Sequence, residues 1–208
     1  MVIDHPIFLE SIRFIRSHLG ANDLNYLEKK VLERLVHTSG DFSVQNLINF
    51  SEGACEKGLQ ALKNGAPILT DTDMAAAAIK SMAENTTRNK VFTARMWFGK
   101  KNNDTNLTKT AYGLSEGWKE LSAMNSVSKS PIVVIGSSPT ALTYLIDILE
   151  NAKDLPSLII GMPVGFIGVE NSKNKLISTD LPRIVLNSTR GGAAMAAAAV
   201  NALLRETI

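Results

Sequence analysis

Short apolar runs alternate with amphipathic stretches along most of this chain. The clearest unit starts with four β-branched residues, Ile132 to Ile135, which end at Gly136 and predict a buried strand. Ser138 and Pro139 then predict a helix start, because serine caps helices and proline suits the first helical position. We therefore expect a strand, a tight turn and a helix. The turn is either an anion site, built from free backbone N–H groups, or an ordinary connection without a ligand.

The same alternation continues on both sides of this unit. Amphipathic stretches predict further helices over residues 7–19, 24–38, 52–63, 74–82 and 108–124, and a closing helix that reaches Arg205. We expect Asn22 or Asp23 to cap the second of these. Short apolar runs predict further strands over residues 66–71, 91–95, 158–162 and 184–186. About five strands alternating with helices predict a mostly parallel sheet in a three-layer α/β/α fold. The two leading helices have no strand between them, so we expect them on the outside or at a dimer surface.

Composition narrows the class of protein. A chain of 208 residues, 45% hydrophobic and 20% charged, fits one globular domain over residues 1–208. A net charge of +2 gives no broad positive field for nucleic acid or a membrane surface. One cysteine, Cys55, excludes an internal disulfide. No signal-like segment opens the sequence and the apolar run 193–200 is too short to span a bilayer, so we expect a cytoplasmic protein.

Among three histidines, His37 is the best candidate for chemistry. It falls in the last turn of the second predicted helix, where the helix dipole favours a protonated ring that could act as an acid. The alternative is a histidine that only caps the helix end. The spacing of His5, His18 and His37 matches no metal-ligand pattern, and we expect no metal site.

Asp71 and Asp73 allow a second interpretation of the site, as that of a phosphatase. A strand that ends in Asp-x-Asp resembles the nucleophile and acid/base pair of haloacid-dehalogenase-type phosphatases. That family has Thr or Val two residues after the second aspartate, whereas Ala75 stands here. We therefore expect one of the two aspartates to cap the helix that follows. No Walker A, G-x-G-x-x-G or G-x-S-x-G sequence is present to support a nucleotide or hydrolase site.

Three Gly-, Ser- and Thr-rich turns should meet at one edge of the parallel sheet. They lie at residues 136–138, 161–168 and 188–192, and Arg190 adds a positive charge to the last. Backbone N–H groups from several converging turns suit a ligand with several carboxylates. The residues alone thus predict a pocket for a polyanionic small molecule, without a cofactor and with one histidine as acid.

Six stretches carry a family resemblance: ESIRFIR, LVHTSGD, GAPILTDTDM, VVIGSSPTAL, IIGMPVGFIGVENSK and TRGGAAMAAAAVNALL. From Phe8 to Leu204 the chain resembles the precorrin-8 methylmutase family (precorrin isomerase) of cobalamin biosynthesis. The resemblance implies a flavodoxin-like fold, a homodimer and no added cofactor. It implies an isomerase that moves a methyl group between adjacent carbons of a tetrapyrrole, with or without cobalt, to give hydrogenobyrinate or cobyrinate. Hand-over to neighbouring enzymes of the pathway would follow.

The resemblance also assigns roles to residues. His37, in the VH..G motif, becomes the general acid, and Ser11 matches a substrate-contacting Ser or Thr of the first helix. Lys109 stands in TKTA where many members have arginine, which keeps the cation but loses the bidentate fork. The remaining expected carboxylate or wall contacts are Gly136, Ser137, Thr140, Gly165, Ser172, Lys173 and Arg190. The segment 97–106 matches the family least and is either a lid or plain surface.

Two other functions compete with the mutase. One is a carrier that holds a corrin without converting it. The other is a Mg²⁺-dependent phosphatase that uses Asp71 and Asp73. Conversion of the substrate would separate the mutase from the carrier, and hydrolysis of a phosphate ester would identify the phosphatase.

Overall fold

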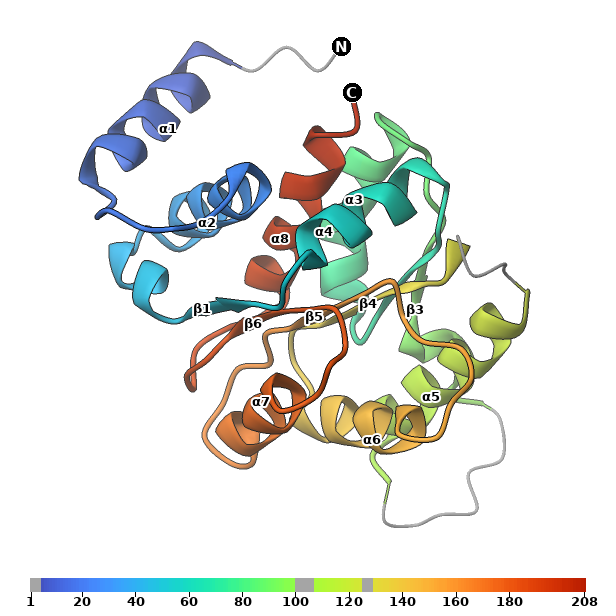
Figure 1. The fold of residues 1–208 in the computed structure, drawn as a ribbon. Coiled ribbons are helices and arrows are strands. Elements are labelled where there is room, and N and C mark those ends of the chain that lie inside the picture. Colours follow the sequence, from blue (N-terminus) through green and yellow to red (C-terminus); the bar gives the residue numbers. More distant parts are fainter. Residues whose placement is uncertain (1–4, 100–106, 125–128) are drawn as a thin grey trace.

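A six-stranded sheet forms the centre of the molecule (Figure 1). The computed structural model describes residues 5–99, 107–124 and 129–208. The strands are β1 (Ile48–Phe50), β2 (Ile68–Thr70), β3 (Val91–Thr93), β4 (Ile132–Ile135), β5 (Leu158–Gly161) and β6 (Arg183–Leu186). Their order across the sheet is β1-β6-β5-β4-β2-β3. Neighbouring strands pair in parallel except β1, which runs antiparallel to β6.

Helices cover both faces of this sheet, so the predicted three-layer fold is confirmed. One face carries α2 (Tyr26–Ser39), α3 (Ala54–Lys63), α4 (Asp73–Glu84) and α8 (Ala193–Arg205). The other carries α5 (Lys109–Met124), α6 (Pro139–Leu149), α7 (Val169–Ile177) and the 3₁₀ turn η2 (Ala94–Trp97). The first helix, α1 (Pro6–His18), lies outside α2, and a 3₁₀ turn, η1 (Phe42–Asn46), leads into β1.

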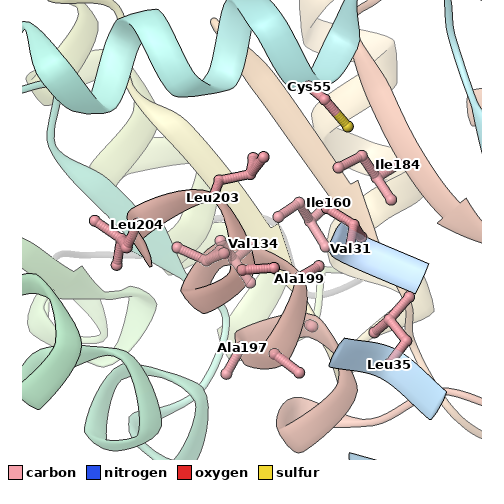
Figure 2. Packing of buried hydrophobic residues seen from close by; sticks show 14 of the residues in the cluster. Val31, Leu35, Cys55, Val134, Ile160, Ile184, Ala197, Ala199, Leu203 and Leu204 are labelled. Carbon is pink, nitrogen blue, oxygen red and sulfur yellow. The ribbon is translucent and has the colours of Figure 1, made fainter. Parts of the chain in front are cut away.

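The core on the α8 face depends on small residues. Figure 2 shows Ala199 of α8 beside the strand side chains Val134 and Ile160, which belong to the same buried cluster as Ala197. Alanines let a helix axis come close to its neighbours, and α8 packs between the sheet, α2 and α4. Because α8 is hydrophobic almost all round, it is buried along nearly its whole length.

Two elements were not predicted. Strand β1 has only three residues and includes Asn49, so it carries too little apolar pattern to stand out. Helix α7 has the polar sequence VENSKNKLI and begins at Gly168, which offers no side-chain cap. The placement of the leading helices was half right: α1 is an outer helix, whereas α2 belongs to the core, since Val31 and Leu35 are fully buried.

Helix caps confirm one prediction and correct two. Ser138 caps α6, and its Oγ accepts from the N–H of Ala141, with Pro139 at the first position. Helix α2 is capped by Asn25, in a reciprocal box with Glu28, in place of the expected Asn22 or Asp23. Helix α4 is capped by Thr72, so neither aspartate of the Asp-x-Asp pair has the expected capping role.

The structure describes only part of the segment 97–106, which was expected to be a lid or plain surface. Trp97 is buried at the end of η2, and its indole N–H donates to Glu120 at 2.9 Å. Trp97 is therefore part of the fold and not of a loop, while residues 100–106 lie outside the described residues. Within the described ranges no helix is long and apolar enough to span a bilayer.

Candidate active site

A pocket of about 560 Å³ opens between α1 and α2. His37 lies in it, in the last turn of α2, just before Gly40 ends the helix in the left-handed conformation. The ring of Phe8 meets the imidazole edge-on, with 5.2 Å between the ring centroids. Phe8 does not line the pocket itself, whose residues besides His37 are Ile7, Glu10, Ser11, Phe14, Ile15, Val36, Gly40 and Phe42. The walls are thus mostly apolar and aromatic, a surface that suits a flat ring system.

The pocket favours the neutral form of His37. Partial burial lowers the pKa of His37, and the positive charge of Arg34, one turn earlier on α2, lowers it further. The expectation that the helix end holds the ring protonated is therefore not met, because desolvation and a neighbouring cation act against the helix dipole. A negatively charged ligand placed beside the ring would raise its pKa again.

Ser11 reaches the same pocket from α1, so the structure brings together two of the predicted site residues. Its hydroxyl donates to the carbonyl of Ile7 at 2.9 Å, one turn back in the helix. The oxygen of that hydroxyl keeps its lone pairs for a donor on a ligand.

Arg190 approaches the end of α2 from the β6–α8 loop. Its Nη1 donates to the Oγ of Ser43 at 2.7 Å, and its Nη2 pairs with the carboxylate of Asp41. The reason is topological: β1 runs antiparallel, so the chain enters β1 at the edge where β6 ends, and the N–H of Asn187 donates to Leu47 at 2.7 Å. Arg190, a predicted carboxylate contact, is thereby held by the two residues on either side of Phe42, which lines the His37 pocket.

The turn after β4 does not offer the free N–H groups that were predicted. The buried carboxylate of Asp71, at the end of β2, accepts from the N–H groups of Gly136 at 3.1 Å, Ser137 at 2.7 Å and Ser138 at 2.9 Å. Burial raises the pKa of Asp71, and these three bonds oppose that rise. The backbone contacts proposed for Gly136 and Ser137 are therefore already used by the protein itself.

This turn lies at the switch point of the sheet. The chain passes from β2 to β3 on one side and then to β4 on the other, which leaves a crevice between β2 and β4. Ligands of open α/β sheets commonly bind in that crevice. Here the carboxylate of Asp71 accepts from the N–H groups of the turn at this crevice. The pocket that contains His37 lies elsewhere, between α1 and α2.

Ser172 and Lys173 lie inside the fold instead of facing a ligand. The Oγ of Ser172 donates to the carbonyl of Val169 at 2.7 Å. The ammonium of Lys173, a residue with 0% exposure, donates to the carbonyls of Ser188 and Arg190 at 2.6 Å each. Burial lowers the pKa of Lys173 to about 8. We therefore replace the predicted substrate contact of these two side chains with a supporting role, in which Lys173 holds the loop that carries Arg190.

The other predicted contacts gather near the starts of α5 and α6. The hydroxyl of Thr140 lies 3.0 Å from the hydroxyls of both Thr108 and Ser138. Lys109 is the first residue of α5 and is exposed. Among the described residues, no hydrogen bond or ion pair joins Lys109 or Thr140 to His37. Gly165 instead connects the β5–α7 loop to the β6–α8 loop, because its N–H donates to the carbonyl of Thr189 at 3.0 Å.

Sequence reasoning missed the aromatic walls and the partner of Arg190. Phe8 and Phe14 were given no role in the site, although both lie within one turn of Ser11. Asp41 and Phe42 directly follow the motif that contains His37, and that position was the available signal. The contact of Asp71 with the β4–α6 turn joins residues 65 to 67 positions apart, and no local pattern marks it.

Comparison with known proteins decides the family. The family model described as Precorrin-8X methylmutase matches residues 6–206. The chain belongs to the precorrin-8X methylmutase family. It is 35% identical to the Precorrin-8X methylmutase of Pseudomonas aeruginosa, over 96% of this chain and 94% of that protein. It is 31% identical to the Cobalt-precorrin-8 methylmutase of a Synechocystis strain, over 97% and 95% of the two chains.

A solved structure supports the same assignment. The precorrin-8x methyl mutase from Thermus thermophilus superposes with a TM-score of 0.84 at 30% identity, covering 97% of this chain and 95% of that one. The resemblance seen in the sequence is thus confirmed, and with it the isomerase class and the role in cobalamin biosynthesis.

The competing functions find no support in this precorrin-8X methylmutase family member. A phosphatase would need Asp71 as a free nucleophile, but its carboxylate is bound by three N–H groups. Asp73 is exposed and pairs with Arg95 at 3.1 Å. No matching protein is described as a carrier or a phosphatase among the relatives compared.

Proposed function

We propose that this chain isomerises precorrin-8, or its cobalt form, with His37 as the general acid. The observation that carries the proposal is the position of His37 in an apolar pocket with aromatic walls, the one pocket described here that also contains Ser11. A macrocycle can lie flat on such walls, with its rim toward the imidazole.

Binding of the substrate itself would favour the protonated, acidic form of His37. In the free protein burial and Arg34 lower the pKa of His37, so the ring is mostly neutral at pH 7. A tetrapyrrole with several carboxylates brings negative charge to the pocket and favours the protonated ring. The imidazolium then donates its proton to the macrocycle and draws electron density from the migrating system. Well-placed acid catalysis contributes ~10²–10⁴-fold.

Atoms balance within the macrocycle. The bond from the methyl carbon to one ring carbon breaks while its bond to the adjacent ring carbon forms. Because the reaction is an isomerisation, the proton given by His37 is returned to the enzyme or to water, and no cofactor is consumed.

Carboxylate arms of the substrate would meet the surrounding cations. Arg190 is held by Asp41 and Ser43, the residues on either side of Phe42, and a substrate carboxylate would compete with Asp41 for its guanidinium. Ser11, Lys109, Thr140 and Gly165 stay proposed contacts on the strength of the resemblance. Lysine at position 109 supplies charge without the bidentate geometry of arginine.

A homodimer, a cytoplasmic location and hand-over to neighbouring corrin-pathway enzymes also stay proposals. The dimer is supported by apolar side chains beside the pocket: Ile7 is 67% exposed and Phe14 is 56% exposed. Apolar side chains grouped on a surface are commonly covered by a ligand or a partner.

The experiment is a visible absorption spectrum of the protein with precorrin-8 or cobalt-precorrin-8. Migration of the methyl group changes the conjugation of the macrocycle, so wild-type protein should produce a new spectrum. The variant His37→Ala should bind the pigment without converting it, whereas His5→Asn, which changes an exposed histidine outside the pocket and keeps a capping side chain at the start of α1, should convert it normally. Full turnover by His37→Ala would show that His37 is not the general acid. Binding without conversion by every protein would favour the carrier.

A further inference from the structure

A second and larger cavity lies on the other flank of α1. Its volume is about 710 Å³, and it is enclosed by α1, α2 and the end of α8. The residues of α1 that line it, such as Phe8 and Arg13, differ from those that line the His37 pocket, such as Ser11 and Phe14. It is therefore a separate cavity, although it shares two helices with the candidate active site.

Positive charge dominates this cavity. Counted by side chains, its lining includes five cations, Arg13, Arg16, Lys30, Arg34 and Arg205, and two carboxylates, Glu33 and Glu206. The surplus of three positive charges exceeds the net charge of +2 of the whole chain. A local excess of positive side chains in one concave site attracts anions.

Both carboxylates are already neutralised. Glu33 receives two hydrogen bonds from Arg16, at 2.5 and 2.9 Å. Glu206 lies 3.6 Å from the ammonium of Lys30 and accepts from the hydroxyl of Tyr26 at 2.9 Å. These pairs leave the charge of Arg34 uncompensated by a carboxylate among the described residues.

Arg34 is held in an unusual way. Its guanidinium lies 5.3 Å from the centre of the Phe8 ring, and that of Arg205 lies 4.8 Å from the same centre. The Nε of Arg34 is buried and has no hydrogen-bond partner. An aromatic ring orients a guanidinium but gives it no acceptor, so a half-buried arginine of this kind is costly until an oxyanion reaches it.

We propose that this cavity binds a small molecule with two or more oxyanion groups, with Arg34 as the main anchor. A carboxylate or a phosphate group would pair with the fork of Arg34, and the apolar side chains of Phe8 and Ile12 would contact the rest of the molecule. The cavity is large enough for a ligand of metabolite size. Binding here is separate from the methyl migration and does not depend on it.

Occupation of this cavity would be felt at His37. Phe8 touches both sites, since its ring meets His37 and lies under Arg34. The charge of Arg34 lowers the pKa of His37, so an anion that neutralises Arg34 should raise it. Among the described residues, Glu10 of α1 lines the His37 pocket, and Asp41, paired with Arg190, follows the end of α2; none of these three charged groups lines the second cavity.

The test is calorimetric titration at low ionic strength with citrate, pyrophosphate and inorganic phosphate. Citrate would represent a carboxylate ligand and pyrophosphate a phosphate ligand, so the tighter of the two identifies the group. Arg34→Gln should weaken binding about 10–100-fold, the range for a charged hydrogen-bonding group. Arg34→Lys keeps the charge without the fork, is the milder change for the fold, and should weaken binding less.

The matched control is Lys29→Gln, which removes one positive charge from an exposed position of the same helix outside the cavity. It should leave binding within about twofold. In parallel, the pKa of His37 followed by NMR should rise on saturation of the wild type and stay unchanged in Arg34→Gln. Absence of binding by all three anions, or equal loss in Lys29→Gln and Arg34→Gln, would overturn the proposal.

Discussion

His37 stands where two electrostatic effects compete. The end of a helix favours a positive ring, while partial burial and Arg34 favour a neutral one. Burial and, to a smaller extent, Arg34 lower the pKa of His37 in the free protein. If His37 is the proposed acid, a ring that stays neutral until substrate binds would avoid protonating other compounds that enter the pocket.

This balance predicts two different pH profiles. If the protonated ring is the active form, kcat/KM should fall as pH rises through the pKa of the free enzyme, which lies below the ordinary value of 6.5. The profile of kcat reports the complex, where substrate carboxylates raise the pKa, so its decline should lie at higher pH. Steady-state rates from pH 5 to 9 measure both. Coincident profiles would show that the substrate does not change the ionisation of His37.

Lys173 is the second residue whose ionisation matters. Replacement by methionine leaves the carbonyls of Ser188 and Arg190 without their donor, and should lower the free energy of unfolding by about 1–3 kcal/mol. The control is Lys175→Met, which breaks only a partly exposed pair with Asp147 and should cost within about 0.5 kcal/mol. Urea unfolding at pH 7 compares them.

The same variant tests the ionisation of Lys173. Because burial lowers its folded pKa from 10.5 to about 8, the unfolded chain binds more protons between these values. Stability contributed by this group is therefore complete above pH 10.5 and is lost as pH falls through about 8. The free energy of unfolding of the wild type should rise with pH over this window relative to Lys173→Met. Parallel curves would contradict a lowered pKa.

At the scale of elements, the contact between β2 and the turn after β4 is the most informative. Asp71→Asn keeps the shape of the side chain but turns an N–H donor group toward backbone N–H groups. We expect a loss on the order of 2 kcal/mol in the free energy of unfolding, because at least one buried N–H loses its acceptor. Asp73→Asn, at an exposed position two residues away, should change stability by less than about 0.5 kcal/mol. Equal effects would show that the contact contributes little.

Local patterns accounted for the elements with strong periodicity. Ile132 to Ile135 and the Ser138–Pro139 helix start were predictable because each signal lies within a few residues. Strand β1 and helix α7 were not, since three residues around Asn49 and a polar, uncapped helix give no clear period. The use of Asp71 as the anion of a distant turn, and the inward direction of Lys173, depend on tertiary packing. Sequence motifs identified His37 and Ser11 as candidate site residues. That they share a pocket depends on the packing of α1 against α2, which no local pattern predicts.

For the whole molecule, we expect a dimer in solution. Besides the side chains around the pocket, Phe166 and Ile167 in the β5–α7 loop are 89% and 90% exposed. So much uncovered apolar surface is unfavourable for a protein that stays alone. Light scattering coupled to size-exclusion chromatography should give twice the 22.5 kDa of one chain. A mass of a single chain at micromolar concentration would contradict the dimer.

The carboxylate in the switch-point crevice also has a consequence for selectivity. In cells, inorganic phosphate and nucleotides compete for any cluster of unoccupied backbone N–H groups. Here the carboxyl group of Asp71 already accepts from the N–H groups between β2 and β4, so those donors are not available to a phosphate ion. An enzyme for a polycarboxylate substrate thereby keeps its most general anion-binding turn out of reach of abundant competitors.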